Sequence, residues 1–206
     1  MYNHIWYTIV RVKPEIIMMV NNDENVSLKI NPSISILGLS HINVVVDDIE
    51  LATEFYSRTL GFTQAYNKDG IMDYSVTSTQ FAVDAGFLDG NVQLQVRFLN
   101  HPTAGIYLEL MQYHNPKGSQ KITFYKTNDL GGVRHVALEV ANVNEMFNFL
   151  KQQPDVKMIN ESVNYGPPKY LPSDFKLAFF YWLDPWGVQW EMEEGRPIGT
   201  IKGIIG

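Results

Sequence analysis

Gly38-Leu39-Ser40-His41-Ile42-Asn43-Val44-Val45-Val46 is a strand-like segment that recurs later in the chain as Gly132-Val133-Arg134-His135-Val136-Ala137-Leu138-Glu139-Val140. Both copies begin at a glycine, carry one histidine at the same place and continue with residues that favour strands. Each copy is followed by a second matching strand that holds a glutamate, Gly105-Ile106-Tyr107-Leu108-Glu109-Leu110 and then Gly187-Val188-Gln189-Trp190-Glu191-Met192. The sequence therefore predicts a duplicated fold with two histidines and two glutamates at equivalent positions.

The composition excludes several classes of protein. A chain of 206 residues suits one compact domain or two small ones. Its net charge of -6 leaves no clustered positive charge for nucleic acid, and without cysteine any metal must be held by imidazole and oxygen. No apolar run is long enough to span a bilayer, and the first thirty residues lack the pattern of a signal peptide. We expect a cytoplasmic protein that binds neither nucleic acid nor membrane.

Five segments follow from turn signals and from the limits of the repeat. The N-terminal extension has two strand-like runs around a polar turn, so it could form a hairpin that supplies an oligomer contact, or a packed addition to the fold. We expect a homodimer. The segments are the extension (1–36), the first module (37–114), a polar linker (115–130), the second module (131–195) and an apolar, glycine-rich tail (196–206).

Both modules read as strand, helix and three further strands, a βαβββ order within an α+β fold. In the first module Asp48 fits a helix N-cap, and Gly61 ends the helix at the expected place. A long loop then precedes a clean period-two strand over residues 91–98. In the second module a helix is expected over about 143–151, with Phe149 where the first helix has Phe55. The turn before the last strand is Asp184-Pro185-Trp186-Gly187.

Strand parity assigns each side chain to one of two sheet faces. The alternate apolar residues of the paired strands predict one face packed under a helix, which leaves the histidines and glutamates together on the other face. On the period-two strand we expect Leu94, Val96 and Phe98 to point to the core. The side chains then expected on a cavity wall, where they would bind substrate or be solvated, are Gln95, Arg97, Tyr107 and Tyr181.

The repeated pairs favour a metal site over the ordinary alternatives. A single strand histidine is more often a core or surface residue than a ligand, and strand glutamates are commonly solvated. The recurrence of both residue types at equivalent places indicates ligands for one divalent ion, namely Ni, Co, Zn, Mn or Fe. The predicted ligands are His41, Glu109, His135 and Glu191.

These residues resemble the vicinal oxygen chelate superfamily, the group of glyoxalases, bleomycin-resistance proteins and extradiol dioxygenases. The resemblance covers about residues 37–195 and rests on the segment 39–48, on Phe55-Tyr56 with Leu60-Gly61-Phe62, and on Asp184-Pro185-Trp186-Gly187 before Trp190-Glu191. It implies paired βαβββ modules that form a curved, half-open barrel of mixed sheet around a divalent metal. The family pattern takes the ligands from the first and last strands of each module, where this chain has the four residues above.

Two histidines and two glutamates are most similar to the ligand set of glyoxalase I. The resemblance implies an enzyme, a metal-dependent lyase or isomerase that acts on a small carbonyl, thiol-adduct or thioester substrate through a metal-bound enediolate. Glu191 would be the base and Glu109 its partner. A non-haem Fe(II) extradiol-type dioxygenase and a small-molecule-binding protein of the same fold are the alternatives. The extension and two long loops, 63–90 and 160–175, depart from a compact glyoxalase I.

Overall fold

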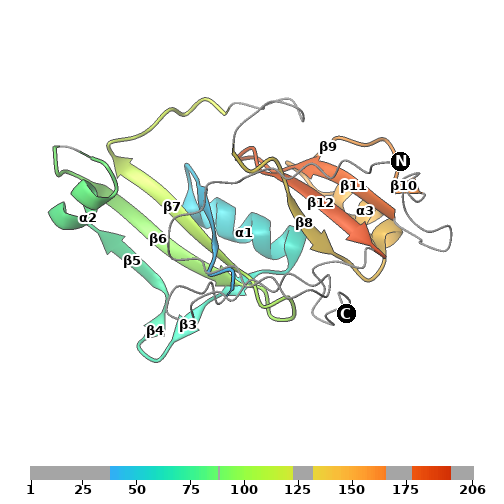
Figure 1. Ribbon diagram of the computed structural model, residues 1–206, viewed down its shortest axis with the longest axis horizontal. Coiled ribbons are helices and arrows are strands. Elements are labelled where there is room, and N and C mark those ends of the chain that lie inside the picture. Colours follow the sequence, from blue (N-terminus) through green and yellow to red (C-terminus); the bar gives the residue numbers. More distant parts are fainter. Residues whose placement is uncertain (1–37, 88, 123–131, 166–177, 196–206) are drawn as a thin grey trace, which may run out of the picture. The chain divides into compact units, whose positions relative to one another are not determined.

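The computed structural model describes residues 38–87, 89–122, 132–165 and 178–195 (Figure 1). The predicted extension and tail therefore lie outside the described residues, as does the second half of the linker, 123–130. All helices and strands described below belong to the unit that spans Ser40–Gly206. No helix within these four ranges is both long and apolar enough to cross a membrane.

The first module forms a five-stranded mixed sheet with a helix on each of its two faces, and a separate two-stranded sheet. Its elements are β1 (Ile42–Val45), α1 (Ile49–Leu60), β2 (Thr63–Gln64), β3 (Tyr66–Asn67), β4 (Gly70–Ile71), β5 (Asp73–Val76), α2 (Thr79–Asp84), β6 (Gln93–Asn100) and β7 (Tyr107–Asn115). The sheet order is β1-β7-β6-β2, and β5 also pairs with β6, while β3 and β4 form a separate two-stranded sheet. β1 and β7 run parallel, and the other pairs run antiparallel.

Local chemistry fixes both ends of α1. The Asp48 side chain accepts hydrogen bonds from the backbone N–H groups of Glu50 and Leu51, which have no partner inside the first helical turn. Gly61 ends the helix in the left-handed conformation at a φ of 75°. Both predictions are confirmed. α1 then packs on β6 and β7 (Figure 1).

The second module repeats this plan over fewer residues. Its elements are β8 (Val136–Glu139), α3 (Val143–Lys151), β9 (Lys157–Met158), β10 (Asn164–Tyr165), β11 (Ala178–Leu183) and β12 (Gln189–Glu194). The sheet order is β10-β11-β12-β8, with β9 also paired to β11, and β8 runs parallel to β12. The predicted α+β fold with two tandem modules is confirmed.

One hydrophobic core joins the two modules. Phe55 and Tyr56 on α1 belong to the same buried cluster as Trp182 and Trp190 from the second sheet. The Phe55 ring lies 6.2 Å from the Trp182 ring, and the Tyr56 ring lies 6.1 Å from the Trp190 ring. Both tryptophans have no exposed surface. Because burial of large aromatic side chains dominates core energetics, α1 stabilises both sheets.

Two predictions about the fold of the modules were wrong. The segment 63–90 is no simple loop, because it carries β2 to β5 and α2. Phe149 does not take the place of Phe55, since it is 42% exposed, whereas Phe147 is buried edge-on against Phe180. The helical spacing of the second module fits either phenylalanine, and packing on β11 selects Phe147.

Candidate metal centre

The first His–Glu pair lies where β1 and β7 run side by side. Their register sets Asn43 opposite Glu109, and His41 immediately precedes β1. His41 Nε2 lies 3.3 Å from Glu109 Oε2, and Asn43 Nδ2 donates a 3.0 Å hydrogen bond to the same oxygen. Ser40 Oγ lies 3.1 Å from His41 Nδ1. Hydrogen bonds of this kind orient a ligand and leave the Nε2 atom directed at the carboxylate.

The second pair has the same construction on β8 and β12. Ala137 pairs with Glu191, and His135 immediately precedes β8. His135 Nε2 lies 3.0 Å from Glu191 Oε2. The imidazole is 37% exposed, whereas the Glu191 side chain is 4% exposed. The two modules therefore present one imidazole nitrogen and one carboxylate each, in matching geometry.

The pairs themselves do not meet within the described residues of one chain. No group of three or more His, Cys, Asp or Glu side chains that could hold a metal ion occurs there. His41 is thus brought together with Glu109, and His135 with Glu191, as two separate half-sites. An imidazole nitrogen and a carboxylate oxygen suit a divalent cation, but a catalytic ion takes at least three protein ligands. The donor types fit a metal, and either pair alone supplies too few of them.

Two of the four predicted substrate contacts lie on the same faces as the half-sites. Tyr107 is two residues before Glu109 on β7 and is 41% exposed. Tyr181 is paired with Glu191 across β11 and β12, and its ring lies 5.5 Å from the His135 ring. Both side chains can therefore border a molecule bound at their half-site.

The sheet face predicted for Gln95 and Arg97 was wrong. The register pairs Phe98 with Glu109 and Arg97 with Leu110, so Phe98 shares the half-site face and Arg97 the α1 face. Gln95 lies on the α1 face with Arg97. Parity could not settle this, because both faces of β6 are covered. A second apolar cluster packs α2 over the alternate residues of β6, and its members Leu94 and Val96 are buried.

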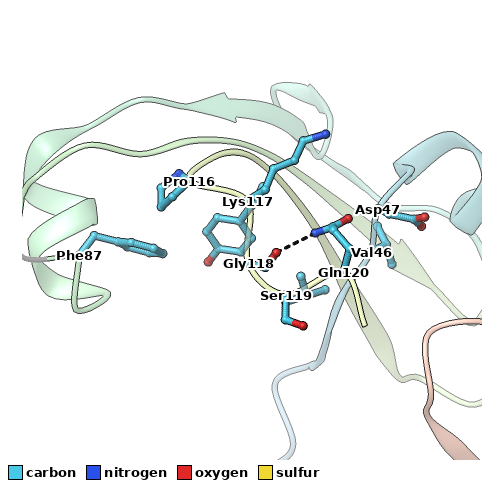
Figure 2. A pocket seen from close by; sticks show the side chains of 10 residues that line it. Val46, Asp47, Phe87, Pro116, Lys117, Gly118, Ser119 and Gln120 are labelled. Atoms are coloured by element: carbon cyan, nitrogen blue, oxygen red, sulfur yellow. Dashed lines mark hydrogen bonds between the residues drawn. The ribbon is translucent and has the colours of Figure 1, made fainter. Parts of the chain in front are cut away.

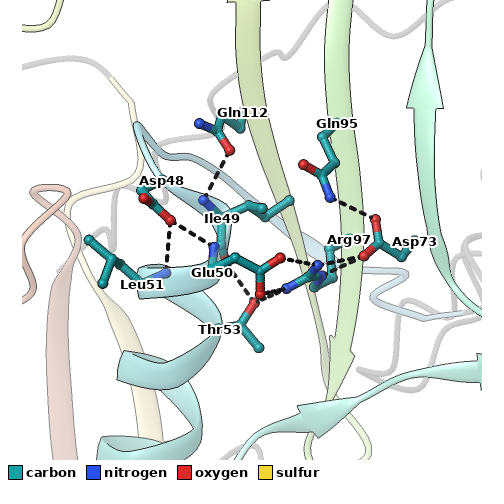
Figure 3. A network of polar contacts seen from close by, with 9 residues as sticks. All are labelled: Asp48, Ile49, Glu50, Leu51, Thr53, Asp73, Gln95, Arg97 and Gln112. Atoms are coloured by element: carbon teal, nitrogen blue, oxygen red, sulfur yellow. Dashed lines mark hydrogen bonds and ion pairs between the residues drawn. The ribbon is translucent and has the colours of Figure 1, made fainter.

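Arg97 is an ion-paired structural residue (Figure 3). Its guanidinium donates to both carboxylate oxygens of Glu50 on α1, at 2.6 and 2.8 Å, and to Asp73 on β5 at 2.6 and 2.9 Å. Thr53 Oγ1 accepts a further bond at 3.0 Å, while Gln95 donates to Asp73. These bonds raise the pKa of Arg97, led by the one to Glu50, and the same bond lowers the pKa of Glu50. Arg97 therefore links α1, β5 and β6.

Aromatic residues near Glu109 were missed by the sequence analysis. Phe98 contacts the His41 ring edge-on, at 5.6 Å between centroids. Tyr74 lies beside Phe98, at 6.3 Å between ring centroids. Burial, and then the charge of Glu109, raise the pKa of both Tyr74 and Tyr113. The signal that could have found Phe98 and Tyr74 is the pairing register of β5, β6 and β7, which one sequence does not reveal.

Comparison with known proteins agrees with this fold. A family model described as Glyoxalase/Bleomycin resistance protein/Dioxygenase superfamily matches residues 38–192. A 2-epi-5-epi-valiolone epimerase from Actinomyces sp. is 27% identical over 160 residues, which cover 76% of this chain and 78% of the relative.

Solved structures are similar at lower identity. A glyoxalase family protein from Bacillus cereus has a TM-score of 0.63 at 16% identity, over 80% of this chain and 98% of its own. The fosfomycin resistance protein FosX from Listeria monocytogenes, in complex with Mn(II) and sulfate, has a TM-score of 0.46 at 18% identity, over 84% and 100%. The first likeness concerns the fold alone, and the second is too weak to bear on the metal of this chain.

Proposed function

The chain belongs to the Glyoxalase/Bleomycin resistance protein/Dioxygenase superfamily, and from that premise we propose that it is a divalent-metal-dependent isomerase or lyase acting on a small carbonyl compound. The observation that carries the proposal is the repeated pair of one imidazole and one carboxylate on each half-site face. The likeness to an enzyme named an epimerase supports the isomerase side. A cytoplasmic location remains a prediction.

The complete site takes ligands from two copies of the chain. One copy would contribute His41 and Glu109, and the second would contribute His135 and Glu191. β1 and β8 are the edge strands of their sheets among the described strands, and each directly follows its histidine. Edge strands are natural places for contact with another chain. A twofold dimer contact occurs twice by symmetry, so it would form two equivalent four-ligand sites.

The metal would supply Lewis-acid polarisation of the substrate carbonyl. The chain's own task is to move a proton to and from the carbon beside that carbonyl. Glu191 is the proposed base and Glu109 the residue that returns the proton, because both carboxylates face the same side of their sheets as the histidines. Tyr107 and Tyr181 would position the substrate. The small polar groups around the first pair, Asn43 among them, would hold the Glu109 carboxylate in place.

Metal content and proton exchange together test this function. The chain purified without added metal should hold one Ni, Co, Zn, Mn or Fe ion per chain by elemental analysis. His41→Ala and His135→Ala should each lose most of it, whereas His114→Ala, a change at an exposed histidine near the end of β7, should keep it. In D2O the loaded protein should exchange the hydrogen beside the carbonyl of its substrate, as followed by proton NMR over a panel of small ketones and thiol adducts.

Two results would contradict the proposal. Full metal content in both His41→Ala and His135→Ala would show that neither histidine is a ligand and would exclude the proposed metal site. Iron together with oxygen uptake on catechols, and no hydrogen exchange, would instead indicate the dioxygenase.

A further inference from the structure

A cavity of about 340 Å³ lies at the end of β1 and β7 (Figure 2). Val45 and Tyr113 line it, and both follow Asn43 and Glu109 at even spacing on their strands, so they share the half-site face. The loop 116–120 forms the opposite wall, and Figure 2 shows the ring of Phe87 directed toward that loop. The volume is within the range of pockets that bind small molecules.

A strip of apolar side chains lies between this cavity and the first half-site. Phe98, which contacts His41, belongs to one cluster with Met111, Tyr113 and Phe87. The Tyr113 hydroxyl lies 3.7 Å from Met111 Sδ, and the Tyr113 and Phe87 rings lie 5.7 Å apart. All four side chains keep part of their surface exposed. Along β7 the strip extends roughly 13 Å from Glu109 to Tyr113 at the usual rise per strand residue.

The lining of the cavity selects a flat, uncharged group. Two aromatic rings and the Val45 side chain supply apolar contact, and aromatic pairs accept a further ring stacked or edge-on. Among the described lining residues, the positive charge of Lys117 and the negative charge of Asp47 sum to zero. Asp47 is held by the Trp186 indole N–H, and Lys117 points away from Phe87 in Figure 2. This arrangement disfavours a phosphate.

We propose that this cavity binds a planar, neutral ring at the far end of the substrate, while the reacting carbonyl lies at His41 and Glu109. The substrate would therefore be an elongated molecule, polar at one end and aromatic at the other. The segment that follows α2 supplies Phe87, which gives the inserted region 63–90 a role in substrate selection. The inference rests on the proposed function for the reacting end, but the cavity itself is built by one chain and needs no metal.

Gly118 offers a clean way to block the cavity. It lines the pocket, and a Cβ added there would meet no atom within 4 Å. Gly118→Trp adds a large side chain to the cavity wall without removing any packing contact, and Gly118→Ala is the matched control that adds only a methyl group. Phe87→Leu is a second variant, which removes one aromatic wall and keeps an apolar side chain.

The test is calorimetric titration of the EDTA-treated, metal-free chain with 2-naphthol, cyclohexanol and inorganic phosphate. We expect one 2-naphthol site per chain in the wild type and in Gly118→Ala, at least tenfold weaker binding in Gly118→Trp and in Phe87→Leu, and weaker binding of cyclohexanol. Absence of 2-naphthol binding, equal affinity in Gly118→Trp, or displacement of 2-naphthol by phosphate would overturn the inference. Because this titration uses no metal, loss of the metal site alone would contradict the proposed function and leave the cavity intact.

Discussion

The hydroxyl of Tyr56 on α1 donates a 2.6 Å hydrogen bond to Oδ2 of Asp184, in the turn between β11 and β12. Asp184 is 2% exposed, and its side chain also accepts hydrogen bonds from the Trp190 indole N–H and from the backbone N–H groups of Trp186 and Val188. A carboxylate with four donors satisfies the rule that buried charge must be hydrogen-bonded. This contact therefore joins the first module to the turn that precedes the Glu191 strand.

Tyr56→Phe should lower the free energy of unfolding by about 1–3 kcal/mol, the cost of leaving a buried polar group with one donor fewer. Urea unfolding followed by tryptophan fluorescence measures this loss. Tyr66→Phe is the control, because Tyr66 is 68% exposed and should change stability by less than about 0.5 kcal/mol. Equal effects of the two variants would contradict the structural role of the Tyr56 bond.

The pH dependence of stability should carry a signature of Asp184. Burial raises its pKa above the ordinary value of 3.8, against the opposing effect of its hydrogen bonds from Tyr56 and Trp190. When the pKa of Asp184 is higher in the folded than in the unfolded chain, its contribution to stability is fully present below the pKa of the unfolded state. That contribution is lost as pH rises through the pKa of the folded state. Relative to Asp184→Asn, the wild type should therefore lose stability as pH rises from about 4. Unfolding curves of both proteins at several pH values test this. If the wild type instead gained stability relative to Asp184→Asn as pH rises, the hydrogen bonds would outweigh the effect of burial on the pKa.

The parts of the fold that were predicted are those set by local chemistry. The Asp48 cap, the Gly61 helix end and the Asp184 turn each depend on a few neighbouring residues, so their residue types specify them. The direction of Arg97 depends instead on which helix covers which face of β6. Both faces are covered, one by α1 and the other by α2, and that choice is made by contacts distant in sequence.

Arg97→Met should destabilise the fold by about 3 kcal/mol, because it leaves the Asp73 carboxylate, which is 23% exposed, without its cation. Glu50→Gln should cost less than about 1 kcal/mol, since the Glu50 side chain is 71% exposed. Chemical denaturation of both variants gives the comparison. Neither change should alter metal content, because Arg97 and Glu109 lie on opposite sheet faces. If a folded Arg97→Met variant lost metal binding, Arg97 would contribute to the metal site after all.

The residue composition of the half-sites could be predicted because the duplication repeats it. His41 with Glu109 and His135 with Glu191 are placed by parallel strand pairs that each module forms alone. The joining of the two pairs could not be predicted in the same way, since it depends on how two copies associate. A mixture of His41→Ala and His135→Ala chains distinguishes a site shared between two copies from a site built by one chain.

His41→Ala and His135→Ala chains should restore metal binding when they are combined. In a dimer with shared sites, each pure variant loses a ligand from both sites. A mixed dimer has one site that lacks both histidines and one site that is complete, because the intact His41 of one chain meets the intact His135 of the other. Denaturing the two variants together and refolding them, with a different affinity tag on each, yields the mixed dimer for purification.

Elemental analysis of that mixed dimer should find about one ion per two chains, and proton exchange should return to about half of the wild-type rate per dimer. Each variant refolded alone is the control and should stay metal-depleted, while folded as judged by its unfolding midpoint. If all four ligands came from one chain, neither variant could complement the other, and the mixed dimer would be as depleted as its parents. Recovery therefore requires that His41 and His135 of different chains hold the same ion.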